Sequence, residues 1–183
     1  MNDQFSLEQI AQRELDAGER LLWSGSPNPW SHIRKGLPLF IFSIPWTAFA
    51  LFWTYGAAGF KVPDFSGPVD FFPLFGVPFI LIGIGMMSSP LYYYFTAKRT
   101  LYALTTKRAM IIKYGTRKYV KSYTDEDIRN IERKEKADGS GDIVFRQEVS
   151  TNSKGHTTTT NIGFIGIQDV RTVEKMLIEQ FKK

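Results

Sequence analysis

Two long stretches of the chain, 36–60 and 71–97, carry no charged residue. A helix rises about 1.5 Å per residue and the hydrocarbon core of a bilayer is about 30 Å thick, so roughly 20 apolar residues cross it. Both stretches exceed that length. The link between them, 61–70, contains two prolines and a glycine, which favour a reversal of the chain. The pattern therefore predicts a two-helix transmembrane hairpin over 36–97.

Basic residues flank this hairpin on its outer ends. Arg34 and Lys35 precede the first stretch, Lys98 and Arg99 follow the second, and the link has only Lys61. Because cytoplasmic loops carry the excess of Lys and Arg, we expect a multi-pass protein with both termini in the cytoplasm. Ionisable residues are missing from both stretches, which argues against a channel or transporter.

Residues 1–35 form a polar segment with a short apolar pattern of helical spacing. The apolar positions of this expected helix are Phe5, Ile10, Ala11 and Leu15. A turn-rich sequence follows Trp23, and an exposed tryptophan needs a partner surface. We expect Trp23 to dock on the folded domain or on the membrane interface.

Residues 98–183 have a different pattern, with short β-branched and aromatic runs separated by turn residues. The expected strands are 100–105, 109–114, 117–123, 128–136, 143–149 and 157–164. Apolar residues at helical spacing then predict an amphipathic C-terminal helix. Its stripe consists of Ile167, Val170, Val173, Leu177 and Phe181. The predicted fold class is an α+β membrane protein whose small, partly open β-barrel is capped by this helix.

Three runs and the paired apolar stretches together resemble one family. The runs are Gly18-Glu-Arg-Leu-Leu-Trp-Ser-Gly-Ser-Pro-Asn-Pro29, Tyr102-Ala-Leu-Thr-Thr-Lys-Arg-Ala109 and Asp138-Gly-Ser-Gly-Asp-Ile-Val-Phe145. They resemble membrane-anchored bacterial proteins with a pleckstrin-homology-like (PH-like) domain. The resemblance implies a seven-strand, partly open barrel with a C-terminal helix at the bacterial cytoplasmic membrane. It implies no enzymatic activity.

Motifs for chemistry are scarce in this sequence. With no cysteine, the chain has no disulfide scaffold, iron–sulfur cluster or thiol nucleophile. Phosphate-binding, dinucleotide-binding and serine-nucleophile motifs are also missing. His32 and His156 are the only histidines, and Asp138 and Asp142 flank a glycine-rich turn better explained by a hairpin than by a calcium loop. We expect no catalytic residue, no metal and no cofactor.

Charge supplies the strongest functional signal. The chain has a net charge of +5, and the run from 98 to 124 contains basic residues and no acid. These candidate lipid contacts are Lys98, Arg99, Lys107, Arg108, Lys113, Arg117, Lys118 and Lys121. Each would gain about 1 kcal/mol near an anionic bilayer surface. Lys107 and Arg108, at a turn, are the preferred pair, and strand alternation should direct only about half of the set toward lipid.

The run therefore predicts an interaction module that is anchored in the membrane and contacts anionic lipid headgroups at the cytoplasmic face. The alternative is a protein–protein scaffold or homo-oligomerisation module without lipid specificity, because small barrels also present sheet edges to peptides or to copies of themselves. Nucleic acid is not expected as a partner, since the inner leaflet already accounts for the basic bias.

Overall fold

The structure is a computed structural model that describes residues 8–61, 67–128, 130–153, 155 and 157–182. The chain divides into two compact units, each described by itself. The first consists of Met1–Asn28 and Thr96–Lys183, and the second of Pro29–Phe95. The sequence assigned 1–35, 36–97 and 98–183 to separate parts, whereas the structure joins the N-terminal residues to the C-terminal domain.

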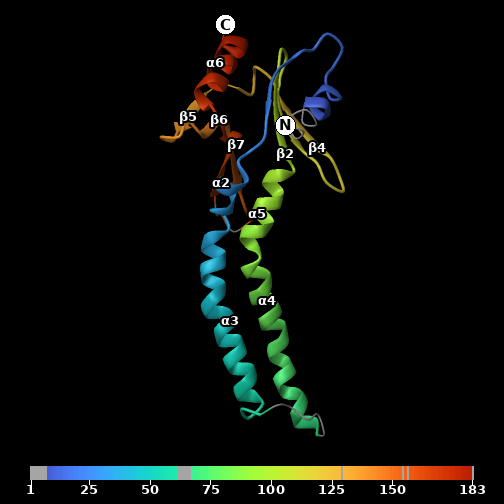
Figure 1. Ribbon diagram of the computed structural model, residues 1–183, viewed down its shortest axis with the longest axis vertical. Coiled ribbons are helices and arrows are strands. Elements are labelled where there is room, and N and C mark those ends of the chain that lie inside the picture. The colour runs from blue at the N-terminus through green and yellow to red at the C-terminus, as the bar shows by residue number, and fades with distance from the viewer. Residues whose placement is uncertain (1–7, 62–66, 129, 154, 156, 183) are drawn as a thin grey trace. The chain divides into compact units, whose positions relative to one another are not determined.

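Two antiparallel sheets and a helix make up the first unit (Figure 1). The larger sheet has the order β1 (Leu21–Gly25), β2 (Thr100–Thr105), β3 (Ala109–Lys113) and β4 (Tyr119–Tyr123). The smaller has the order β5 (Glu132–Glu135), β6 (Gly141–Thr151) and β7 (Thr157–Ile167), and α6 (Val170–Phe181) follows it. The predicted α+β class is confirmed.

The core of this unit contains side chains from both sheets and from α6. The ring of Phe164 lies 5.1 Å from that of Tyr102 and 5.6 Å from that of Phe145, measured between centroids. The buried residues of α6 are Val170, Val173, Leu177 and Phe181. They are the stripe predicted from helical spacing, except that Ile167 ends β7 instead of beginning the helix.

The N-terminal residues complete this unit in two ways. Strand β1 pairs with β2, and the Trp23 ring lies 5.4 Å from Phe164, so the expected docking of Trp23 on the folded domain is confirmed. Residues 8–12 are helical, and Ala11, fully buried, packs with Met110 on the opposite face of the larger sheet. Ile10 and Leu15 join this second cluster, while Phe5 lies outside the described residues.

Helices make up the second unit. They are α2 (Pro29–Ile33), α3 (Leu37–Ala57), the 3₁₀ helix η1 (Pro68–Gly76), α4 (Val77–Met87) and α5 (Ser89–Lys98), whose last residues belong to the first unit. Within the described residues, α3 is the one unbroken helix long and apolar enough to cross a membrane. Phe71–Met87 and Ser89–Lys98 reach that length only together, and they are bent by 42° at the break.

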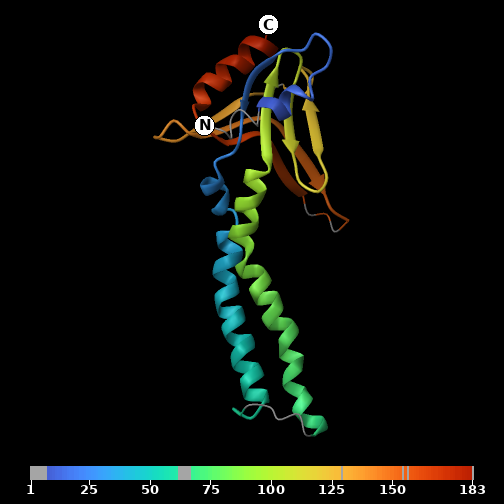
Figure 2. The ribbon, with the colours of Figure 1, turned by 45° about the vertical axis from the view of Figure 1, so that its right-hand side comes forward.

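Helices α3 and α4 run side by side in both views (Figures 1 and 2). Gly83 allows this close approach, because a Cβ atom there would stand 2.2 Å from the hydroxyl oxygen of Thr47. At the start of α3, the buried Ser89 hydroxyl donates a 2.9 Å hydrogen bond to the carbonyl of Gly36. These contacts fix α3 against α4 and against the start of α5.

Candidate functional site

Strand register divides the predicted basic set between the two faces of the larger sheet. In the β3–β4 hairpin, Lys121 pairs with Ile111, and Ile111 packs against the main core. Lys113 pairs with Tyr119 two positions further along the strands, so this second pair lies on the same face. The intervening pair of Ile112 and Val120 therefore belongs to the other face, on which residues 8–20 lie. Residues 8–20 are called the strap below.

Arg108 is the centre of a polar network that ties the strap to the sheet. Its Nε and Nη2 atoms donate hydrogen bonds of 3.1 and 3.0 Å to the carboxylate of Glu19. Nη2 also lies 3.1 Å from a carboxylate oxygen of Asp16 and donates to the carbonyl of Glu14. Nη1 donates to the Ser122 hydroxyl on β4 at 3.3 Å. Arg108, in the turn between β2 and β3, thus joins the strap to β4.

Glu19 is a fully buried carboxylate with several donors. Besides Arg108, the Thr105 hydroxyl donates at 2.5 Å and the backbone N–H of Asp16 at 2.8 Å. Burial raises the pKa of Glu19, but the Arg108 hydrogen bond, with those from Asp16 and Thr105, outweighs burial and holds that pKa below its usual range. The glutamate is therefore charged in the folded protein at neutral pH.

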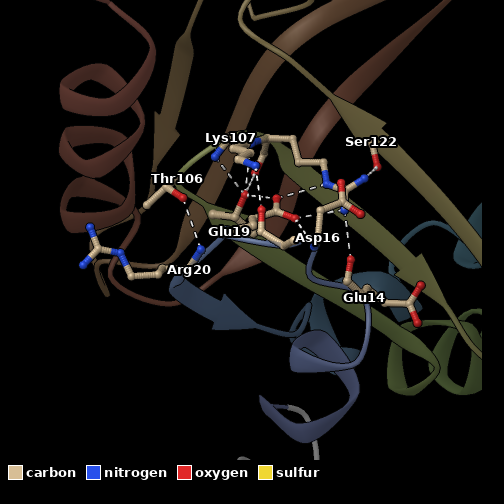
Figure 3. A network of polar contacts seen from close by, with 10 residues as sticks. Glu14, Asp16, Glu19, Arg20, Thr106, Lys107 and Ser122 are labelled. Carbon is tan, nitrogen blue, oxygen red and sulfur yellow. Dashed lines mark hydrogen bonds and ion pairs between the residues drawn. The ribbon is translucent and has the colours of Figure 1, made fainter.

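Two further members of the basic set also contact the strap. Lys107 donates from Nζ to the carbonyl of Ala17 at 3.0 Å, and Lys118 forms an ion pair with Glu14. Figure 3 shows Lys107 in one polar network with Glu14, Asp16 and Glu19 of the strap. The structure thus engages Lys107 and Arg108, the preferred pair from the sequence, in internal contacts, because their partners come from residues about 90 positions earlier.

The rest of the basic set lies toward the other end of the larger sheet, with Lys121 midway along β4, opposite Ile111. Tyr114 directly follows β3. Its N–H donates a 2.9 Å hydrogen bond to the carbonyl of Arg99, and its hydroxyl donates a 2.6 Å hydrogen bond to the carbonyl of Lys98. The β3–β4 turn is therefore joined to the residues that enter β2. We call this group the basic hairpin end: Lys98, Arg99, Lys113, Arg117 and Lys121.

Exposure distinguishes the hairpin end from Arg108. The side chains of Lys113, Arg117 and Lys121 are exposed, and no ion pair involves them in the part of the chain that the structure describes. Tyr119, which faces the same side as Lys113, is 60% exposed. The arrangement leaves cations and one aromatic ring exposed on the surface of the first unit.

Asp138 and Asp142, the two carboxylates of the glycine-rich turn, have structural roles. Asp138 accepts the N–H of Ser140 at 3.0 Å and its hydroxyl at 2.6 Å, and Gly139 adopts a positive φ of 74°, so the predicted hairpin turn is confirmed. Asp142 accepts the N–H of Gly166 at 2.7 Å. His156 lies outside the described residues. Within them, no three His, Asp or Glu side chains converge in a way that could hold a metal ion.

Comparisons with family models, with curated proteins and with solved structures give no match for this chain.

Proposed function

We propose that this protein is a membrane-anchored, PH-like interaction module of the bacterial cytoplasmic membrane, and that its basic hairpin end contacts anionic lipid headgroups. The observation that carries the proposal is the pair of Tyr114 hydrogen bonds to Lys98 and Arg99. These two residues directly follow the uncharged stretch 71–97. A hairpin fixed at the end of a membrane span has its cations within reach of the headgroup layer.

Exposure of apolar side chains supports the membrane location. Ile41, Phe49 and Phe52 of α3 are 62%, 68% and 67% exposed. In the most apolar 18-residue segment of that helix, 11% of the residues are buried. A helix with such a surface is costly in water and stable in hydrocarbon, since burial of apolar area contributes about 25 cal/mol per Å².

Strand pairing supports an even number of crossings. Gly25 of β1 is the Cα partner of Tyr102 of β2, so the chain leaves the first unit before α3 and returns to it at the end of α5. Both ends of 29–95 then lie on one side of any membrane that this segment crosses. Basic residues at both ends favour the cytoplasm as that side.

The strand and helix order supports the PH-like assignment. Seven described strands form sheets of four and three, and α6 follows β7 directly. We propose no enzymatic activity, cofactor or nucleic-acid partner for this module.

The test uses the full chain in nanodiscs and exploits its lack of cysteine. A fluorophore on Thr116→Cys, in the exposed β3–β4 turn, is quenched by a spin label on the lipid headgroup when the turn meets the bilayer. We expect stronger quenching in discs of phosphatidylglycerol than of phosphatidylcholine. The difference should shrink at about 0.5 M salt, where the Debye length is about 4 Å.

Charge removal gives the matched comparison. Lys113→Gln, Arg117→Gln and Lys121→Gln together should weaken contact with anionic discs by up to about 3 kcal/mol at low salt. Lys136→Gln, Lys175→Gln and Lys182→Gln remove the same charge from exposed positions elsewhere and should leave quenching unchanged. Equal quenching in neutral and anionic discs would reject a specific contact with anionic headgroups and favour the protein-scaffold or homo-oligomer alternative.

A further inference from the structure

A second surface with lipid-binding chemistry lies within the second unit, apart from the basic hairpin end. A cavity of about 500 Å³ opens between the start of α3 and the bend that separates α4 from α5. Ile33 and Leu37 line one side, and Met87 and Leu91 line the other. Its lining is almost wholly apolar, and its volume is typical of a small-molecule site. We call it the bend groove.

The local sequence explains why the groove exists. The Ser89 hydroxyl bonds to the Gly36 carbonyl, and a Cβ atom at Gly36 would stand 2.7 Å from the backbone nitrogen of Pro90. The helices therefore touch at this point, while the 42° bend at Ser88 turns α5 away from the axis of the preceding helix. An apolar space remains beside the contact.

Aromatic residues with polar edges border the groove. The Trp30 ring lies 5.7 Å from the Tyr94 ring, edge to face, and Trp30 is 71% exposed. Tryptophan and tyrosine favour the boundary between hydrocarbon and water. The 21 residues of α3 span about 31 Å, the thickness of the hydrocarbon core, so a groove at its first turn belongs at that boundary.

Basic groups lie beside the apolar lining. Arg34 and Lys35 occupy the turn between Ile33 and Leu37, and Lys35 Nζ lies 3.4 Å from Nε2 of His32. No acidic residue occurs in 29–60 or in 71–98, so this end of the unit has one sign of charge. An occupant that suits both parts has an apolar tail and an anionic head.

We infer that the bend groove binds one molecule of an anionic phospholipid, with an acyl chain against Ile33, Leu37 and Leu91 and the phosphate group beside Arg34 and Lys35. Basic pockets between transmembrane helices on the cytoplasmic side bind anionic headgroups in this manner. The inference rests on the membrane location proposed above, but it involves none of the residues of the basic hairpin end.

Native mass spectrometry of the full chain, released from membranes in mild detergent, tests this site. Phosphatidylglycerol and phosphatidylcholine with the same acyl chains are the probes. We expect one tightly bound phosphatidylglycerol, favoured about 10- to 30-fold over phosphatidylcholine, because two cations attract a headgroup of net negative charge more than one whose phosphate is offset by the choline cation.

Three variants separate the contributions. Arg34→Gln with Lys35→Gln should reduce the preference to less than about threefold, and Leu91→Trp, which fills the groove at a position already 56% exposed, should weaken both lipids. The triple hairpin variant Lys113→Gln, Arg117→Gln and Lys121→Gln should retain the bound lipid. If the hairpin variant retains the bound lipid, the bend groove is a separate site from the basic hairpin end.

Several outcomes would overturn the inference. One is equal binding of the two lipids, and another is an unchanged preference for phosphatidylglycerol in the Arg34 and Lys35 variant. A third is a dimeric protein in which Leu91→Trp disrupts the association of the two copies instead of lipid binding. If the chain instead fails to float with membranes at all, the proposed membrane function fails together with the groove. A floating chain without a preferred lipid rejects the groove alone.

Discussion

Glu19 is the residue on which attachment of the strap depends most. It is fully buried, yet it is ionised because Arg108, Thr105 and the Asp16 N–H all donate to its oxygens. Removing one partner of a buried pair leaves the other with unmet hydrogen bonds, which is usually more costly than the net value of the pair. Arg108 retains Asp16 and the Glu14 carbonyl, which limits this cost.

We predict that Glu19→Gln destabilises the first unit by about 1–3 kcal/mol. Trp23 fluorescence reports unfolding in denaturant once the tryptophans of the second unit, Trp30, Trp46 and Trp53, are replaced by Phe in all variants. Glu179→Gln, on an exposed face of α6, is the control and should have little effect. Because the folded pKa of Glu19 is lowered, its stabilisation is present above pH about 4.3 and is lost as pH falls through the folded value. A stability difference between the parent and Glu19→Gln that persists undiminished at pH 3 would contradict this.

At this scale the sequence predicted residue types but not their partners. The eight cations of 98–121 look equivalent in the printed sequence, and the Thr-Lys-Arg turn suggested an exposed pair. Arg108 is only 21% exposed because Glu19 reaches it from a separate part of the chain. Alternation did predict that the set would divide between two faces, since it depends only on strand geometry.

At the scale of elements, strong apolar periodicity was sufficient to predict a helix, whereas the weaker pattern of short strands was not sufficient to predict all of them. Helix α6 was predicted correctly from the spacing of its apolar residues alone, because one apolar stripe determines which face of a helix is buried. Strand β1 was missed, since five residues before a turn-rich run carry little pattern and acquire strand structure only by pairing with β2. β5 is shorter than predicted and β6 longer, as is usual for element boundaries.

Helix α6 provides the next prediction. Leu177→Ala should cost about 2–5 kcal/mol, because Leu177 is fully buried among both sheets and truncation leaves a cavity. Ile178→Ala, at a neighbouring position that is 38% exposed, should cost much less. Chemical denaturation of the full chain followed through Trp23 measures both, and equal effects would show that the Leu177 face is not core.

At the scale of the whole molecule, hydropathy predicted where the apolar stretches lie but not where the second one breaks. The run 71–97 has no charge, yet it divides at Ser88 into α4 and α5, and its first part includes η1. Hydropathy averages apolar character and does not register helix geometry at a Ser-Ser-Pro sequence. Hydropathy also could not predict that residues 1–28 and 96–183 form one unit, because β1 and β2 pair although they are far apart in the sequence.

That pairing makes the membrane topology testable with single cysteines in a cysteine-free chain. Because Gly25 and Tyr102 are strand partners, a hairpin crossing would keep both flanks of 29–95 on one side of the membrane and the end of α3 on the other. The flanking Lys and Arg residues predict that the side with both flanks is the cytoplasm. We predict that a membrane-impermeant maleimide labels Lys61→Cys in intact spheroplasts and labels Lys136→Cys, exposed in the first unit, only after permeabilisation. Labelling of both cysteines in intact spheroplasts, or release of the chain by alkaline carbonate, would exclude a cytoplasm-facing hairpin.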